Sequence, residues 1–255
     1  MKRILSIVLI LTFCLSLAAC GNTSTPPAET PKLVSTPAPE LNSTPTPRPT
    51  PEPTPEPEPE IEIISEQLVL KTNGDTYIYL CEFINPCDFA ISISDISIDL
   101  EDAGGNLLSV SDYVSSKPST IAPGGHGYIC EQVLNANFDT DVDINAVAKA
   151  VLHYDVEKDT YSALPVEITS VSLGTKTSFP NVLGRVKNTG DKDLTFVYIS
   201  FPVYSADGIL QTVITAFVDV EAGEEVSFEQ MGIYADYQVD YSASYLGDPV
   251  IYPLF

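Results

Sequence analysis

The chain contains no tryptophan and only two histidines and two methionines among its 255 residues. It is also poor in positive charge, because 12 Lys and Arg residues stand against 35 Asp and Glu residues and give a formal net charge of −23. A surface with this charge repels nucleic-acid phosphates and anionic lipid headgroups, so we expect neither as an electrostatic partner. The charge indicates a well-solvated surface that can attract cations.

The sequence lacks the motifs of common catalytic and cofactor sites. It has no HExxH, no GxSxG, no P-loop and no Cys-x-x-Cys pair. His126 stands in a Gly-Gly-His-Gly turn and His153 in a strand-like stretch, and we interpret both as structural residues. The sequence therefore predicts a protein that is not an enzyme and needs no cofactor.

Long apolar runs are missing except at the beginning of the chain. Lys2 and Arg3 precede a run from Ile4 to Leu17, which is too short for a comfortable membrane span. A short cationic start followed by such a run is typical of a secretory signal peptide, and we assign residues 1–19 to it.

The apolar run ends in the sequence Leu17-Ala18-Ala19-Cys20. This motif resembles the bacterial lipobox, in which an aliphatic residue and two small residues precede an obligatory cysteine. The resemblance implies that Cys20 receives a diacylglyceryl thioether and becomes the mature N-terminus. Each buried methylene contributes about 0.8 kcal/mol, so two or three acyl chains anchor a protein firmly. The alternative is an ordinary signal peptide that is cut nearby, with Cys20 incidental.

Residues 20–60 comprise the lipidated cysteine and a linker dominated by Pro, Thr and Glu. This composition cannot form a core, and its repeated Thr-Pro and Glu-Pro pairs favour an extended polyproline II chain. At about 3.1 Å per residue, such a linker reaches roughly 120 Å, and we interpret it as a disordered stalk. Similar stalks are common on lipoproteins of Gram-positive bacteria. A PxxP ligand and threonine glycosylation are further possibilities.

After the linker, the sequence changes to short runs in which apolar and polar residues alternate. Period two over the stretches 76–85 and 89–100 predicts half-buried strands, and clusters of Gly and Asn between such runs predict turns. In the first of these runs the apolar face consists of Tyr77, Tyr79, Cys81 and Phe83.

The second half of the chain repeats the pattern of the first half at an offset of 103 residues, which aligns Asn85 with Asn188. Further on, residues 123–125 match residues 222–224 at an offset of 99, so the first copy has four extra residues in between. We interpret this as an internal duplication of about ninety residues. The same offset of 103 aligns Asp88, Ile96, Gly105 and Leu107 with Asp191, Ile199, Gly208 and Leu210.

Each copy predicts about seven short strands joined by turns, which favours a sandwich of two antiparallel sheets. The predicted fold class is therefore all-β, with two tandem immunoglobulin-like β-sandwich domains over residues 61–163 and 164–255. Because the chain has no tryptophan, the buried Trp that marks true immunoglobulin domains is not expected.

The second copy resembles the FxLYD family of small β domains, which are found on prokaryotic secreted and lipid-anchored proteins. The resemblance lies in residues 184–188, 201–205, 207–208, 222–224 and Phe228, with Val203 and Ser205 in place of the Leu and Asp of the name motif. It covers residues 165–246 well and the first copy only weakly. It implies a fold and a location, and it brings no catalytic residues.

Three cysteines follow the linker, and all of them lie in the first copy. Disulfides are permitted outside the membrane, and the strands that carry Cys81 and Cys130 are neighbours in an immunoglobulin-type sheet. We therefore predict a possible Cys81–Cys130 bridge, with Cys87 as the alternative partner.

Two clusters are weaker candidates for binding. Asp139, Asp141 and Asp143 alternate and could hold calcium, although the EF-hand pattern is incomplete and a solvated loop explains them as well. Tyr237, Tyr241 and Tyr245 would share one face of a late strand. Such a face could stack on sugars or peptides, or it could belong to the sandwich core.

The sequence as a whole predicts a non-enzymatic lipoprotein on the outer side of a cell membrane, with two β-sandwich modules for binding, adhesion or envelope structure. Its partners would be the membrane, through the lipid anchor, and an unidentified envelope or extracellular protein or glycan. The alternative is a lipoprotein that captures sugars or peptides through an aromatic face or a cleft between the domains.

Overall fold

The structure is a computed structural model that describes residues 57–174 and 179–253, and these residues belong to one compact unit. The predicted signal peptide, Cys20 and most of the predicted stalk lie outside the described residues. Among the described residues, no helix is both long and apolar enough to cross a bilayer.

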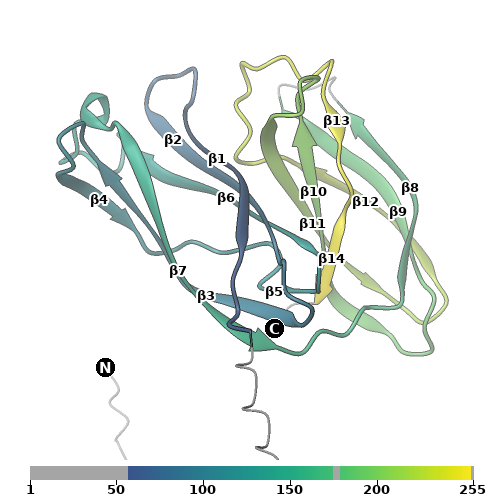
Figure 1. The fold of residues 1–255 in the computed structure, drawn as a ribbon. Coiled ribbons are helices and arrows are strands. Elements are labelled where there is room, and N and C mark those ends of the chain that lie inside the picture. The colour runs from purple at the N-terminus through teal and green to yellow at the C-terminus, as the bar shows by residue number, and fades with distance from the viewer. Residues whose placement is uncertain (1–56, 175–178, 254–255) are drawn as a thin grey trace, which may run out of the picture. The chain divides into compact units, whose positions relative to one another are not determined.

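The described chain is built almost entirely from antiparallel strands, which confirms the predicted all-β class. We call the part from β1 to β7 the first sandwich and the part from β8 to β14 the second sandwich; Figure 1 shows them as two separate groups of strands. The strands of the first sandwich are β1 (Glu62–Leu70), β2 (Thr76–Ile84), β3 (Ala90–Glu101), β4 (Leu107–Ser111), β5 (Thr120–Ile121), β6 (His126–Asn135) and β7 (Lys149–Asp159), with the 3-10 turn η1 (Ile144–Ala146) before β7.

In its described residues the second sandwich also has seven strands, as the sequence predicts. The chain passes from the end of β7 to the start of β8 in six residues, so the two sandwiches follow one another closely. Its strands are β8 (Val166–Gly174), β9 (Asn181–Asn188), β10 (Leu194–Tyr204), β11 (Leu210–Val220), β12 (Glu225–Met231), β13 (Tyr245–Leu246) and β14 (Val250–Pro253).

Both sandwiches pair their strands in the same pattern. In the first sandwich, β1, β2 and β6 form one sheet, and β3 pairs with β4 and β5 on one side and β7 on the other. In the second sandwich, β8, β9 and β12 form the three-stranded sheet, and β10 pairs with β11 on one side and with β13 and β14 on the other. The long strand β11 thus takes the place that β4 and β5 share in the first sandwich.

Each core lies between its two sheets and is filled by alternate residues of the strands. In β2, Tyr79, Cys81 and Phe83 are fully buried, and they pack against β3 residues such as Ile91 and Ile98. This confirms the apolar face predicted for that strand. The core of the second sandwich contains Val182, Val186, Val197, Ile199, Phe201, Val203 and Ile214.

A buried asparagine ties the same turn in both sandwiches. The Asn85 Nδ2 atom donates to the carbonyl oxygens of Phe89, 2.9 Å away, and Ile121, 3.0 Å away. The Asn188 Nδ2 atom donates to the carbonyl oxygens of Lys192, 2.7 Å away, and Val220, 3.1 Å away. These partners are related by the offsets of 103 and 99 residues on which the sequence repeat was aligned. Both asparagines are fully buried. Each side-chain amide therefore provides the hydrogen bonds that water would otherwise give to the backbone carbonyl groups of the turn.

The two sandwiches meet in a small apolar cluster of their own. Ile78 and Leu80 of β2 and Cys130 of β6 pack there against Leu210 and Val213 of β11. These β2 residues point away from the first core, because side chains alternate along a strand. Strand β2 is therefore buried on both of its faces.

Polar contacts close the edges of this contact. The Thr72 backbone N–H and hydroxyl both donate to one carboxylate oxygen of Asp236, at 2.7 and 2.5 Å. The Gln67 Nε2 atom donates to the carbonyl oxygen of Leu210 at 3.1 Å. Together with the apolar cluster, these bonds join the two sandwiches into the compact unit.

Candidate functional site

A cleft of about 490 Å³ opens beside the contact between the two sandwiches. Strands β2 and β6 and the turn before β6 line one wall, and the ends of β10 and β14 line the other. We call it the inter-sandwich cleft. Its polar side chains come from both sandwiches and are Glu82, Thr120, His126, Tyr128, Tyr161, Tyr204 and Asp248.

Glu82 is the most enclosed charged group of this cleft. Its side chain is only 10% exposed, and one of its carboxylate oxygens lies 3.0 Å from Nδ1 of His126. The pair is diagonal across β2 and β6, since Glu82 lies opposite Tyr128 and His126 lies opposite Ile84. The two strands thus fix both groups on the outer face of the first sandwich, next to the ring of Tyr128, which stacks on the imidazole at 6.5 Å.

Two tyrosines meet across the cleft. The hydroxyl oxygens of Tyr128 and Tyr204 lie 3.4 Å apart, and the Tyr204 ring stacks on Tyr245 at 5.6 Å. Burial raises the pKa of Tyr128 to about 12. Burial, together with the hydrogen bond to Tyr128, also raises the pKa of Tyr204 above its usual range. Both hydroxyls therefore stay protonated at neutral pH and act as neutral donors and acceptors.

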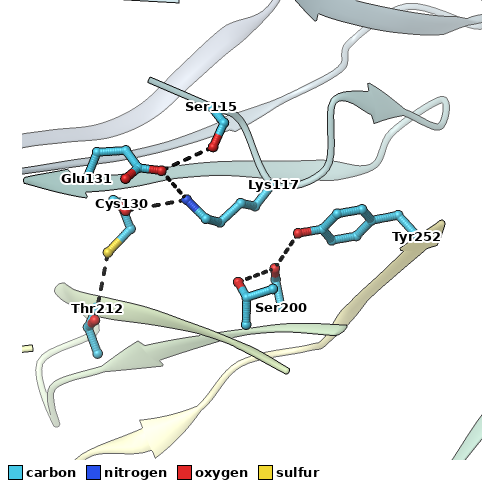
Figure 2. A network of polar contacts seen from close by, with 8 residues as sticks. Ser115, Lys117, Cys130, Glu131, Ser200, Thr212 and Tyr252 are labelled. Atoms are coloured by element: carbon cyan, nitrogen blue, oxygen red, sulfur yellow. Dashed lines mark hydrogen bonds and ion pairs between the residues drawn. The ribbon is translucent and has the colours of Figure 1, made fainter. Parts of the chain in front are cut away.

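A polar network supports the first-sandwich side of the contact (Figure 2). The Lys117 Nζ atom lies 2.6 Å from a carboxylate oxygen of Glu131 and also donates to the Cys130 carbonyl oxygen at 3.4 Å. Lys117 reaches this position because its backbone pairs with Tyr128 of β6. The Ser115 hydroxyl donates to the same Glu131 oxygen at 3.1 Å.

The second-sandwich side has its own chain of hydroxyl groups. Ser200 is fully buried, and its hydroxyl lies 2.8 Å from that of Thr215 and 3.0 Å from that of Tyr252. The Cys130 Sγ atom and the Thr212 hydroxyl, 3.7 Å apart, connect the two sides, as Figure 2 shows. These groups are thus paired with one another, as burial requires, whereas the buried hydroxyl of Ser116, next to Lys117 in the chain, has no hydrogen-bond partner among the described residues.

The predicted disulfide is wrong, because Cys81, Cys87 and Cys130 are all free thiols. Cys81 lies opposite Ile129, whereas Cys130 lies opposite Leu80, so the two sulfurs point to opposite faces of the sheet. Cys81 belongs to the core of the first sandwich and Cys130 to the contact with the second. Burial raises the pKa of Cys81 to about 12 and also raises that of Cys130. Both thiols are therefore poor nucleophiles at neutral pH.

The three aspartates proposed for calcium do not assemble into a site. The Asp139 carboxylate accepts a hydrogen bond from the backbone N–H of Asn135, and the Asp143 carboxylate accepts one from that of Asn145. Asp143 thereby caps η1, and Asp141 is exposed. Among the described residues, no group of three or more potential ligands is placed to share a metal ion. Of the two alternatives for this segment, the structure agrees with the solvated loop.

The three tyrosines predicted to share a strand face are also separated. Residues 232–244 form turns between β12 and β13, because the Asp236 and Asp240 carboxylates accept hydrogen bonds from backbone N–H groups two residues ahead. Tyr241 is buried in the second core, where its hydroxyl accepts from the Asp236 N–H at 3.2 Å. Tyr237 and Tyr245 are exposed, and only Tyr245 lies near the cleft, through its contact with Tyr204.

The contact face of β2 was not predicted from the sequence. The predicted apolar face of β2 is the one that enters the core, whereas Ile78 and Leu80 on the opposite face pack against the second sandwich. A strand with apolar residues on both faces predicts burial on both sides. That signal would have indicated a covered outer face on the first sandwich, with Glu82 at its margin.

Comparisons with known proteins show no family for this chain. Neither a scan against protein-family models nor a search of the curated proteins finds a match. Among solved structures, a β-glucuronidase of Bacteroides uniformis is 14% identical, with 64% of this chain and 22% of that chain covered and a TM-score of 0.20. The exo-chitosanase CsxA of Amycolatopsis orientalis is 13% identical, with coverages of 61% and 20% and a TM-score of 0.21.

A third partial likeness is to dimeric latent PorU from Porphyromonas gingivalis. It is 15% identical, with 76% of this chain and 20% of that chain covered and a TM-score of 0.22. This chain therefore spans about a fifth of the length of these three structures. Likenesses of this size say nothing about what this chain binds or does.

Proposed function

We propose that this chain is a non-enzymatic surface lipoprotein that captures a ligand in the inter-sandwich cleft. The observation that carries this proposal is the convergence of Glu82 and Tyr128 from the first sandwich with Tyr204 and Asp248 from the second around one cleft. A concave site with apolar walls and a few converging polar groups is the usual form of a small-ligand site.

The sequence supports the location in this proposal. The motif that ends in Cys20 and the proline-rich linker behind it favour a lipid anchor and a spacer on the outer side of a cell membrane, in a Gram-positive bacterium. Within this proposal, the two sandwiches are FxLYD-like modules. The partner is then a component of the envelope or the extracellular medium, either a peptide or a glycan.

The absence of catalysis belongs to the proposal and rests on the chemistry of the side chains. Each histidine pairs with a carboxylate on a neighbouring strand: His126 with Glu82 and His153 with Asp99. The buried thiols have raised pKa values, and the cleft tyrosines stay protonated. These groups suit binding better than nucleophilic attack.

The binding part can be tested with ¹⁵N-labelled protein comprising residues 21–255 and pools of peptide and glycan fragments from a bacterial envelope. We expect chemical-shift changes at Glu82, Tyr128 and Tyr204 in the presence of a bound pool. Replacing the exposed cleft residue Ala163 with Trp should abolish them, whereas Trp at the exposed Ala148, outside the cleft, should not. Shift changes that persist in the Ala163→Trp protein would contradict the cleft as the binding site.

The anchoring part needs a separate experiment in cells. We expect Cys20→Ser to remove palmitate labelling and to move the protein from the membrane fraction to the medium. Unchanged labelling and fractionation would exclude the lipid anchor while leaving the binding proposal to its own test.

A further inference from the structure

The inter-sandwich cleft has an unbalanced set of charges. Glu82 and Asp248 line it, and no lysine or arginine is among its lining residues in the described chain. Its one basic side chain, His126, uses Nδ1 to contact Glu82. A ligand anion would therefore meet two carboxylates without a fixed cation, whereas a ligand cation would meet complementary charge. The net charge of −23 on the chain strengthens this preference by attracting cations from a distance.

The burial of the Glu82 side chain strengthens the attraction of its carboxylate for a bound cation. With a side chain only 10% exposed, this carboxylate is shielded from most of the solvent that weakens ion pairs at a protein surface. The exposed carboxylate of Asp248 lies on the opposite wall of the same cleft. A cation between these walls would thus be held from two sides.

The remaining lining suits an ammonium group on an apolar body better than a bare metal ion. An ammonium has three N–H donors, and the cleft offers the Glu82 and Asp248 carboxylates and the Tyr204 hydroxyl as acceptors. Apolar side chains beside them can cover methylene groups, and tyrosine rings attract cations through their faces. These apolar lining residues are Ile121, Pro249, Val250 and Ile251.

We propose that the inter-sandwich cleft binds a primary ammonium group carried on an apolar body, with Glu82 as its main charged partner and Asp248 as the second. This inference rests on the proposed function and names the ligand class of the same cleft. The lysine side chain of a peptide has this chemistry, because its ammonium group stands on a stem of four methylene groups.

The second sandwich provides a matched control. Arg185 and Glu225 stand where Glu82 and His126 stand in the first sandwich, as the offsets of 103 and 99 residues show. This second pair is 3.3 Å apart, but both of its side chains are exposed, and it lies outside the inter-sandwich cleft. Glu225 occupies the position of His126, so Glu225→Gln removes a carboxylate from the equivalent ion pair without touching the cleft.

The test is calorimetric titration of residues 21–255 near neutral pH with Nα-acetyl-lysine methylamide and, separately, with its Nε-acetylated form. The amine of a lysine side chain has a pKa of about 10.4, so the first probe is a cation near neutral pH. The Nε-acetylated probe is neutral. Losing a hydrogen bond to a charged group costs about 1.5–3 kcal/mol, so the neutral probe should bind at least about tenfold more weakly. Glucosamine and N-acetylglucosamine form a parallel pair; binding of glucosamine but not of the lysine probe would overturn the inference, because the glucosamine amine stands on a hydroxylated ring.

We expect Glu82→Gln to weaken binding of the cationic probe at least about tenfold, Asp248→Asn to weaken it less, and Glu225→Gln to leave it unchanged. Asp248 is exposed, so its variant should fold even if Glu82→Gln does not. Equal binding of the cationic and neutral probes overturns the inference, as does an equal loss in the Glu225→Gln protein. If neither amine binds but a neutral envelope fragment still shifts the cleft residues, this inference fails and the proposed function stands.

Discussion

The two sandwiches hold the same buried asparagine in the same turn, yet they fill the space beneath it with different side chains. In the first sandwich, Phe83 lies opposite Gly127 on the paired strands β2 and β6. In the second sandwich, the equivalent positions are Val186 and Val226, which also lie opposite one another. The first sandwich thus pairs a large residue with a glycine where the second sandwich pairs two residues of medium size.

The neighbouring pair of positions shows the opposite exchange. Cys81 lies opposite Ile129 in the first sandwich, whereas Gly184 lies opposite Phe228 in the second. A Cβ atom added to Gly184 would come within 2.6 Å of the Phe228 ring, so this ring occupies the space that a side chain there would need. The volume of each core layer, rather than the identity of its residues, is what the two copies share. Cys81 is accordingly a small core residue with no need for a partner sulfur.

The outer faces of the two equivalent sheets differ more than their cores. Glu82 and His126 are drawn into the cleft, while Arg185 and Glu225 at the same positions remain at the surface. The apolar contact residues Ile78, Leu80 and Cys130 correspond to Asn181, Leu183 and Glu229. One copy has therefore turned its outer face into a contact and a cleft wall, and the other has kept a largely polar face.

The largest effect should follow from removing either buried asparagine. Each of Asn85→Ala and Asn188→Ala leaves several buried backbone groups unpaired, at about 1–3 kcal/mol per group, so we expect losses of about 4 kcal/mol in the free energy of unfolding. Urea denaturation measures this, with the exposed Asn145→Ala as a control that should change stability by less than about 0.5 kcal/mol. A loss in only one of the two sandwich variants would break the equivalence between the copies.

A comparable but smaller effect is expected at Lys117, which has no counterpart in the second sandwich because β11 runs on where β4 and β5 are interrupted. Lys117→Met leaves Glu131 largely buried without its cation, and we expect a loss of about 3 kcal/mol. The double variant Lys117→Met/Glu131→Leu should recover most of this loss in the same denaturation experiment. No recovery would show that packing, rather than the unpaired charge, causes the effect.

The exchange of core volume can be tested by giving the first sandwich the two valines that the second sandwich has at the equivalent positions. Gly127→Val places a Cβ atom within 2.3 Å of the Phe83 ring, and we expect it to destabilise the protein by about 2–3 kcal/mol. Phe83→Val leaves a cavity and should cost a similar amount. The double variant should be more stable than either single variant, with a coupling energy of at least about 1 kcal/mol. Additive losses would contradict the compensation.

A moderate and pH-dependent effect is expected at Asp236, which joins the second sandwich to Thr72 of the first. Burial, the largest single influence, favours the protonated form, but the hydrogen bonds from Thr72 and Gln238 together with the charge of Lys71 outweigh it and lower the pKa of Asp236 from its ordinary value of 3.8. A lowered folded-state pKa means that the contribution is complete above pH 3.8 and is lost as the pH falls through the folded-state pKa below it. At neutral pH, Asp236→Asn should cost about 1–2 kcal/mol.

The pH dependence of this stability difference tests the assignment. The stability difference between the wild type and Asp236→Asn should be constant from neutral pH down to about pH 5 and should shrink in more acidic solution. A difference that grows toward low pH would mean that the carboxylate is not the stabilising form.

The smallest effect should occur at Arg185, the second-sandwich counterpart of Glu82. Its ion pair with Glu225 is exposed to solvent, and such pairs contribute about 0–1 kcal/mol, so Arg185→Ala should change the free energy of unfolding by less than about 0.5 kcal/mol. Thermal or urea unfolding would show it. A loss above about 1 kcal/mol would indicate that this outer face is more than a solvated surface.

Strand periodicity was sufficient to predict the fold, and it was not sufficient for the candidate site. The alternation over β2 and β3 and the aligned asparagines predict seven strands and a repeated turn because these features depend on neighbours in the chain. The cleft depends on which outer face the second sandwich covers, and that is decided by residues about eighty positions apart, such as Cys130 and Thr212. The prediction that Tyr237, Tyr241 and Tyr245 share one strand face was wrong for a local reason. Asx turns at Asp236 and Asp240 bend the chain there, although the sequence alternates as in a strand.

The contact between the sandwiches joins unlike surfaces, the three-stranded sheet of one copy and the β11 side of the other. Head-to-tail contacts of this kind can in principle add further units without end. Here the corresponding sheet of the second copy exposes Arg185 and Glu229 beside Leu183, so charged groups interrupt its outer face. A further module stacked on this sheet would take these two charges out of water, so Arg185 and Glu229 disfavour continued stacking on this surface.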